Sequence, residues 1–232
     1  MKNENKLTRC DFHCHPLSHK YYPASDYNKN IVLTEEDKED IRDYIHWCIH
    51  VRKLDVTAIT DHDLIQSSLY AREYVKQNNL PIKIICGAEC EVFIRDDEYL
   101  EIGKYKFREW NYCHMLVLGV DHIPEHKSNM TELEFKAWAD KIRSIGGIVV
   151  MSHPLFSKLV FYIIAEHLDG FESINRDVLE FGEGIEYSDK EKLNLKAFTN
   201  SDYHWYNDDR TEKSIPINVN YESSDFINGL VW

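Results

Sequence analysis

The residues of this chain that could do chemistry are histidines and acids in short, regular patterns. The sequence has twelve histidines, and its first pattern is Asp11-x-His13-x-His15. Side chains alternate along a β-strand. This spacing therefore predicts three polar side chains on one face and, toward the helical layer, Cys10, Phe12 and Cys14. Imidazoles and a carboxylate that share a buried face need a partner, and a divalent metal ion is the partner that fits them. The alternative is a solvated edge strand.

Five further patterns of the same residue types follow along the chain. They are Asp61-His62-Asp63 after an apolar run, Glu89 at the end of another, His114 inside a third, His153-Pro154, and Asp202-x-His204. Each one alone also fits a structural role, such as a helix cap, a buried salt bridge or a hydrogen-bonded core histidine. All six in order, each near a predicted strand, indicate one shared metal centre.

The elements that must position these residues are short apolar runs alternating with helical patterns. Thr34 predicts the start of a helix whose buried side carries Ile41 and Ile45, and Thr131-x-x-Glu134 is a capping box that predicts another. Further helices are expected over 64–77 and between 176 and 193. Strands are expected at 10–15, 56–60, 82–88 with an extension to 94, 113–119, 148–151, 170–174 and 195–199.

This alternation predicts an α/β fold with a mainly parallel sheet covered by helices. An open sheet and a closed barrel fit the periodicity equally well. The polar residues come from six different strands or strand ends, and a barrel gathers such residues at one mouth, so a barrel is favoured. No repeat or linker divides the chain, which predicts a single domain over 1–232 with 206–232 as its closing segment.

Composition excludes several classes of protein. Lys and Arg number 27 against 40 Asp and Glu, a net charge of −13, which disfavours a binder of duplex DNA. No apolar run is long enough for a membrane span, and the N-terminus has no secretory h-region. The six cysteines contain no C-x-x-C pair. They predict buried thiols in a cytoplasmic protein, with a thiolate zinc site as the alternative.

The order DxHxH, TDHD, GxE, His in an apolar strand, HP and SDxH resembles the polymerase and histidinol phosphatase (PHP) superfamily. The resemblance covers about 10–205, and the segment from Gly170 to Asn175 also resembles a family segment. It implies a distorted (β/α)7 TIM-like barrel that holds two or three divalent ions (zinc, manganese or iron) and hydrolyses phosphate esters.

The resemblance also implies a set of ligands. A first ion would be held by His13, His15, Glu89 and Asp202, and a second by the bridging Glu89 with His114 and His153. A third ion would use His62 and His204 with a residue from the following loop. Where many relatives carry an acid, this chain has Ser18-His19-Lys20, which makes His19 the candidate there. The family's arginine near the His-Pro motif is also not evident.

The function expected from these residues is hydrolysis of a phosphate ester by metal-bound hydroxide. Glu89 would fix the separation of the ions, and the leaving group would take its proton from Asp63 or from a metal-oriented water. Three basic residues could grip phosphate oxygens, although each also fits a solvated surface position: Lys158, Arg176 and Arg210.

A small phosphomonoester is the favoured substrate. The alternative is a phosphodiesterase or exonuclease acting on nucleotides or oligonucleotide ends, which the aromatic residues near Tyr21 and Trp205 could serve by stacking a base. An amidohydrolase-like enzyme fits less well because it usually needs a lysine-type bridge. A non-catalytic scaffold is the remaining alternative. The oligomeric state is open.

Overall fold

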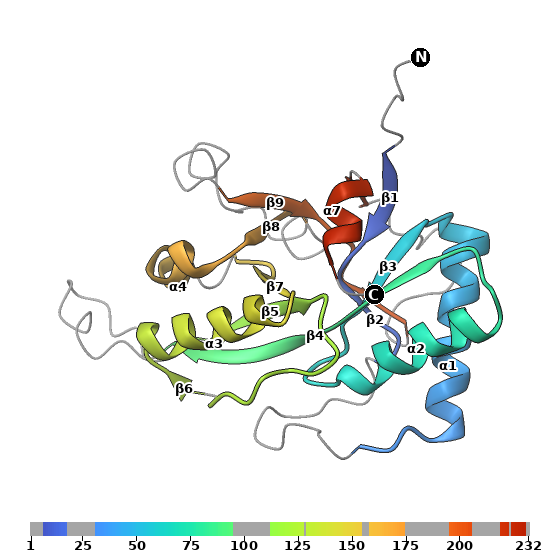
Figure 1. Cartoon of the computed structure of the whole chain (residues 1–232), viewed down its shortest axis with the longest axis horizontal. Helices are drawn as coiled ribbons and strands as arrows, with labels where there is room; N and C mark the ends of the chain where they lie inside the picture. The colour runs from blue at the N-terminus through green and yellow to red at the C-terminus, as the bar shows by residue number, and fades with distance from the viewer. Residues whose placement is uncertain are drawn as a thin grey trace.

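The computed structural model describes residues 7–17, 31–94, 112–127, 129–154, 158–174, 195–205, 219–222 and 224–230. Its main sheet curves around a shared interior, with helices packed on the outside (Figure 1). The strand order is β11 (Asn220–Glu222), β1 (Thr8–Asp11), β3 (Val56–Ile59), β4 (Lys83–Ile94), β5 (Tyr112–Leu118), β7 (Ile148–Met151), β8 (Gly170–Ile174) and β9 (Lys196–Thr199). The short β6 (Asn129–Met130) pairs with the end of β4. A separate pair joins β2 (Cys14–His15) to β10 (Tyr203–His204).

The two edge strands of this sheet, β9 and β11, meet through side chains. The backbone N–H of Thr199 donates to Asn220 at 2.8 Å, and the Lys196 ammonium lies 2.7 Å from Glu222. The sheet is therefore nearly closed, and the prediction of an α/β barrel-like fold is confirmed.

Among the described strands, five of the eight pairings in this sheet are parallel, as predicted, and three are antiparallel. Of the seven predicted strands, β5 runs antiparallel to both of its neighbours, β4 and β7, and the added strand β11 runs antiparallel to β1. The sheet is mixed. Hydrophobic alternation reads the same in both directions along a strand, so it carries no information on strand direction.

The interior of the barrel is filled by apolar side chains from most of its strands. They include Cys10, Phe12, Ala58, Leu116, Val150 and Phe198, and helix α7 (Ser224–Gly229) adds Ile227. Cys10 and Phe12 therefore face the interior and not the helical layer, contrary to expectation. The strand breaks after Asp11 and restarts at Cys14, and this break changes the phase of alternation.

Helices cover the outside of the barrel in two groups. The first group, α1 (Glu35–Trp47) with its π-helical extension Cys48–Arg52 and α2 (Ile65–Gln77), packs on Cys14, Ile59 and Ile84. The second, α3 (Glu132–Ser144) and α4 (Lys158–Ile164) with the 3-10 turn Ala165–His167, packs on the outer side of β4, β5 and β7.

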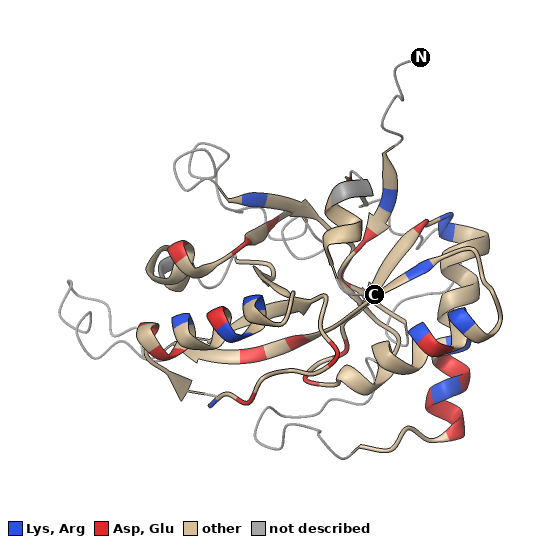
Figure 2. Cartoon of the chain, in the orientation of Figure 1, with Lys and Arg blue, Asp and Glu red and all other residues tan. Residues whose placement is uncertain are grey.

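Capping boxes start both α1, where the sequence predicts a cap at Thr34, and α3, where it predicts the box itself. The Thr34 hydroxyl accepts a hydrogen bond from the backbone N–H of Asp37, and the Thr131 hydroxyl accepts one from the backbone N–H of Glu134. In return, the side chain of each acid accepts a hydrogen bond from the backbone N–H of its threonine. Acidic residues in the first turn of α1, visible in Figure 2, also favour the positive end of the helix dipole. Both helices therefore begin where local side chains satisfy the free backbone N–H groups.

All six cysteines are buried free thiols, as expected. None of them belongs to a candidate metal group within the described part of the chain. No helix among the described residues is long and apolar enough to cross a membrane.

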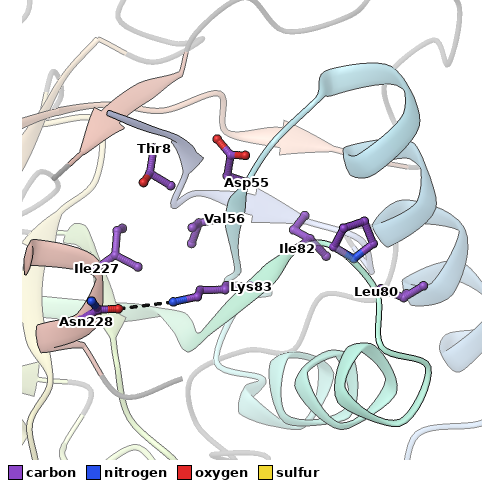
Figure 3. A pocket seen from close by; sticks show the side chains of 9 residues that line it. Thr8, Asp55, Val56, Leu80, Ile82, Lys83, Ile227 and Asn228 are labelled. Carbon is purple, nitrogen blue, oxygen red and sulfur yellow. Dashed lines mark hydrogen bonds between the residues drawn. The ribbon is translucent and has the colours of Figure 1, made fainter. Parts of the chain in front are cut away.

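A cavity of about 430 Å³ opens at the amino-terminal ends of β1, β3 and β4 (Figure 3). Thr8, Val56 and Lys83, the first residues of those strands, line it, and Lys83 donates to Asn228 of α7 at 3.3 Å. The cavity thus lies at the end of these strands away from Glu89.

Candidate metal centre

Glu89 lies at the centre of a group of five histidines from separate parts of the sequence. Its Oε1 is 3.2 Å from each of His13 Nε2, His114 Nδ1 and His153 Nε2. Its Oε2 is 3.3 Å from His15 Nε2 and 3.2 Å from His62 Nδ1. The two carboxylate oxygens therefore face two different sets of imidazoles, as a carboxylate that bridges two ions does.

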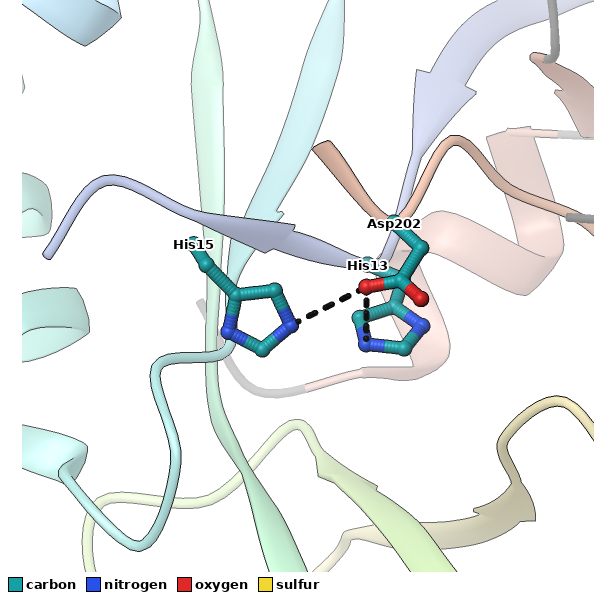
Figure 4. A group of neighbouring side chains, drawn as sticks. All are labelled: His13, His15 and Asp202. Carbon is teal, nitrogen blue, oxygen red and sulfur yellow. Dashed lines mark ion pairs between the residues drawn. The ribbon is translucent and has the colours of Figure 1, made fainter. Parts of the chain in front are cut away.

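Asp202 forms the second acidic point of the cluster. Its Oδ1 lies 3.2 Å from His13 Nε2 and 3.3 Å from His15 Nε2, and Figure 4 shows both rings directed at it from β2 and the turn before it. His204 Nε2 is also 3.2 Å from this oxygen. The β2–β10 pairing, in which His15 stands opposite His204, brings the first and last motifs of the sequence together.

The direction of β5 explains how His114 reaches this group. His114 is the third residue of β5, inside an apolar run, and a parallel strand would carry it away from the mouth. Because β5 is antiparallel to β4, its first residues lie beside the last residues of β4. His153 enters from the turn that follows β7, and His62 from the turn that follows β3.

The donor atoms of this cluster fit metal ions better than they fit one another. Nε2 of His13, Nε2 of His15 and both oxygens of Glu89 are buried and form no hydrogen bond with the described residues. Two ligands bound to one ion at about 2.1 Å stand about 3.0–3.4 Å apart in octahedral or tetrahedral geometry. The separations of 3.2–3.3 Å fall in this range. Three groups of donors could each hold an ion: His13, His15 and Asp202; His13, Glu89 and His153; His15, His62 and Glu89.

The electrostatics of the cluster keep its two carboxylates charged despite their burial. Burial alone would raise the pKa of Glu89 and of Asp202, but the surrounding histidines, His13 foremost, hold both pKa values well below the usual range. Burial lowers the pKa of His15 and of His153, yet the nearby carboxylates of Asp202 and Glu89 outweigh it and raise both values to about 9. Two buried carboxylates thus stay charged and require cations beside them.

Four of the histidines mark the open side of the cluster. His13, His15 and Glu89 are fully buried, whereas the side chains of His62, His114, His153 and His204 keep between 12% and 19% exposure. A substrate would approach from this side.

Glu172 of β8 is a functional candidate that the sequence patterns alone do not single out. Its Oε1 accepts from His13 Nδ1 at 2.9 Å and from the Asn200 amide at 2.7 Å, and its Oε2 accepts from the backbone N–H of His153 at 2.9 Å. A carboxylate in this place fixes the ring orientation of His13 and leaves Nε2 for an ion. Two signals were available: an acid inside an apolar strand, and the resemblance of the segment from Gly170 to Asn175 to a family segment.

Replacing Glu172 with Gln is expected to weaken zinc affinity by about 10–100-fold, because carboxylates that orient a ligand histidine have effects of this size. A competition titration against a chromogenic chelator measures this change. Glu166→Gln, at an exposed glutamate in the turn before β8, is the matched control. If Glu172→Gln and this control bind zinc with equal affinity, Glu172 does not support the metal site.

Asp11 does not join the cluster, although the alternation placed it beside His13 and His15. Its carboxylate is fully buried and receives the guanidinium of Arg52 and the hydroxyl of Ser201. It also accepts from the backbone N–H groups of His13 and Ser201 at 3.3 and 3.2 Å. Asp11 therefore holds together the two turns that carry His13 and Asp202.

The turns that carry the candidate ligands contain unusual backbone. Asp63, His153 and Asp202 have positive φ values of 49°, 24° and 53°. Residues other than glycine adopt this region at a cost, which the surrounding contacts must offset. The contacts of Asp202 with His13 and of His153 with Glu172 supply that support.

Asp63 lies beside the cluster but contacts none of its nitrogens in the described structure. Its backbone N–H donates to the carbonyl of Glu89 at 2.9 Å, and its carboxylate is buried. Burial, with help from Glu91 and Glu89, raises the pKa of Asp63 to about 8. Its role as a proton donor stays a prediction.

The side chains of four predicted site residues cannot be placed among those that the structure describes. His19, Arg176 and Arg210 fall on residues that the structure does not describe, as does the side chain of Lys158 at the start of α4. Trp205 is 4% exposed and packs on Tyr44 and Trp47. It cannot stack a base, so the interpretation of Trp205 as a stacking residue was wrong.

Comparisons with known proteins identify similar solved structures. No protein-family model and no curated protein matches the sequence. A protein from Bifidobacterium adolescentis, named as a candidate metal-dependent phosphoesterase, is similar with 14% identity and a TM-score of 0.48, over 95% of this chain and 94% of that one. An amidohydrolase from Chromobacterium violaceum with bound sulfate and no metal is similar with 14% identity and a TM-score of 0.48, over 84% of this chain and 87% of that one.

Proposed function

We propose that this protein is a metal-dependent phosphoesterase whose substrate is a small phosphate monoester. One observation carries the proposal: Glu89 presents one oxygen to His13, His114 and His153 and the other to His15 and His62. This is the arrangement that a pair of neighbouring ions needs.

Different residues of the cluster would bind different ions. His13, His15, Asp202 and Glu89 would hold one ion, and Glu89 with His114 and His153 a second; His62 and His204 are available for a third. When bound, divalent ions of this kind activate a water molecule and neutralise the charge of the phosphoryl group. Glu89 would be a ligand shared by two such ions, while Glu172 orients the ring of His13 and Asp11 holds its backbone.

The surroundings favour hydrolysis of an ester by this centre over an amidohydrolase-type site. The position between the two groups of histidines belongs to a glutamate, whereas an amidohydrolase usually needs a lysine-type bridge there. The buried ligands His13 and His15 keep water from the rear of the site, while the partly exposed histidines leave its front open.

The test compares turnover of a chromogenic phosphate monoester with that of the matching diester, using protein loaded with manganese or zinc. We expect the monoester to be preferred, and activity to disappear on chelation and return with added metal. Preference for the diester would favour the nucleotide or oligonucleotide alternative. Metal analysis that finds less than one tightly bound ion per folded chain would overturn the catalytic proposal and favour a scaffold.

A further inference from the structure

The β4–β5 ribbon has two distinct faces, and the metal ligands lie on only one of them. Cys90, Val92, Cys113 and Met115 belong to the buried core on the α3 side. Glu89 stands opposite Leu116, a residue of the barrel interior. Alternation therefore directs Glu89, Leu116 and His114 to the same side of the ribbon, toward the interior and its mouth.

An aromatic pair continues this inner face beyond the metal ligands. Phe93 and Tyr112 stand directly opposite each other, with ring centroids 5.2 Å apart and the ring planes tilted by 54°. Phe93 lies four residues after Glu89, and Tyr112 two residues before His114, so both share the face of the ligands. Each of the two residues is 36% exposed.

The pair is also linked to the metal centre by direct contact. The Tyr112 hydroxyl contacts Nε2 of His114, and the two rings lie 4.7 Å apart, edge to face. Nδ1 of the same histidine faces Glu89 at 3.2 Å. A row of contacts therefore runs from Glu89 through His114 to Tyr112 and Phe93.

We propose that Phe93 and Tyr112 form a subsite for a planar ring on the leaving group of the ester. This inference rests on the proposed function. Two residues along a strand span about 7 Å, so the aromatic pair begins about one such step from the ligands. A ring that reaches it is separated from the phosphorus by a short spacer, as the base of a nucleoside phosphate is by its sugar. Partly exposed aromatic rings gain contact area and stacking energy when such a ring covers them.

The test uses non-hydrolysable phosphonates, so that binding is measured without turnover. Phenethylphosphonate and butylphosphonate carry the same acidic group, and only the first has a planar ring. We expect the zinc-loaded protein to bind phenethylphosphonate at least about fivefold more tightly in calorimetry, since one stacked ring has an effect of this size or larger. Phe93→Ala should bring the two dissociation constants together and leave that of butylphosphonate unchanged.

Three variants complete the experiment. Tyr112→Phe retains the ring and should retain the preference. Tyr221→Ala removes a 58% exposed aromatic residue from β11, which pairs with the first residues of β1, and should change neither constant. Phe93→Leu replaces Phe93→Ala if the latter does not fold, and it should also reduce the preference.

The outcomes separate this proposal from the proposed function. If butylphosphonate binds and phenethylphosphonate binds no better, the ring subsite is wrong while the phosphoesterase proposal stands. A preference that survives in Phe93→Ala also overturns the subsite. If neither compound binds to metal-loaded protein, the proposed function fails, and the subsite fails with it.

Discussion

Replacing Glu89 with Gln is expected to reduce kcat/KM by at least about a thousandfold, which corresponds to about 4 kcal/mol of transition-state stabilisation. Glutamine has nearly the same shape but lacks the negative charge that faces five imidazoles. The amide nitrogen of glutamine cannot bind a cation, so one of the two groups of histidines around residue 89 loses the oxygen that would complete its metal site. We expect the bound metal to fall from two or more ions per chain to one or fewer.

Metal analysis after gel filtration and steady-state kinetics on the preferred ester check both parts of this prediction. Glu73→Gln is the control, because Glu73 is an exposed glutamate on the outer helix α2. That variant should keep the wild-type metal content. Wild-type turnover and metal content in Glu89→Gln would show that the bridge assignment is wrong.

Replacing Arg52 with Met is expected to destabilise the metal-free protein by about 3–5 kcal/mol, the range found when one partner of a buried ion pair is removed. Both Arg52 and Asp11 have fully buried side chains, and their contact is the only ion pair of Asp11 among the described residues. Methionine fills much of the space but leaves the Asp11 carboxylate without its cation. Metal affinity should fall as well, because Asp11 holds the backbone of His13.

Chemical denaturation of metal-free protein measures this loss, and the midpoint should shift without a change in slope. The control is Arg72→Met, since Arg72 pairs with the 59% exposed carboxylate of Asp121. Such a pair contributes about 0–1 kcal/mol. Adding Asp11→Leu to Arg52→Met should restore part of the stability, because no buried charge then remains unpaired. A change of less than about 1 kcal/mol in Arg52→Met would contradict the assignment.

Features governed by neighbouring residues could be predicted from the sequence. The helix caps at Thr34 and Thr131 and the bounds of β7 and β8 agree with the expectations. Caps and alternation depend on contacts within a few residues, so a local pattern is sufficient to reveal them. The same holds for the types of the cluster residues, because buried imidazoles and carboxylates at strand ends already require a cation.

The tertiary structure alone decided which of these residues meet. Asp11 shares the spacing of His13 and His15, yet it pairs with Arg52, 41 positions away, and with Ser201, 190 positions away. Glu172 reaches His13 across 159 positions, and β5 delivers His114 to the mouth because it runs antiparallel to β4. Strand direction and long-range pairing depend on the packing of the whole sheet, and alternation is unchanged when a strand is reversed. The sequence by itself therefore determined the chemistry of the donors, while the closure of the mixed sheet decided which of them face one another.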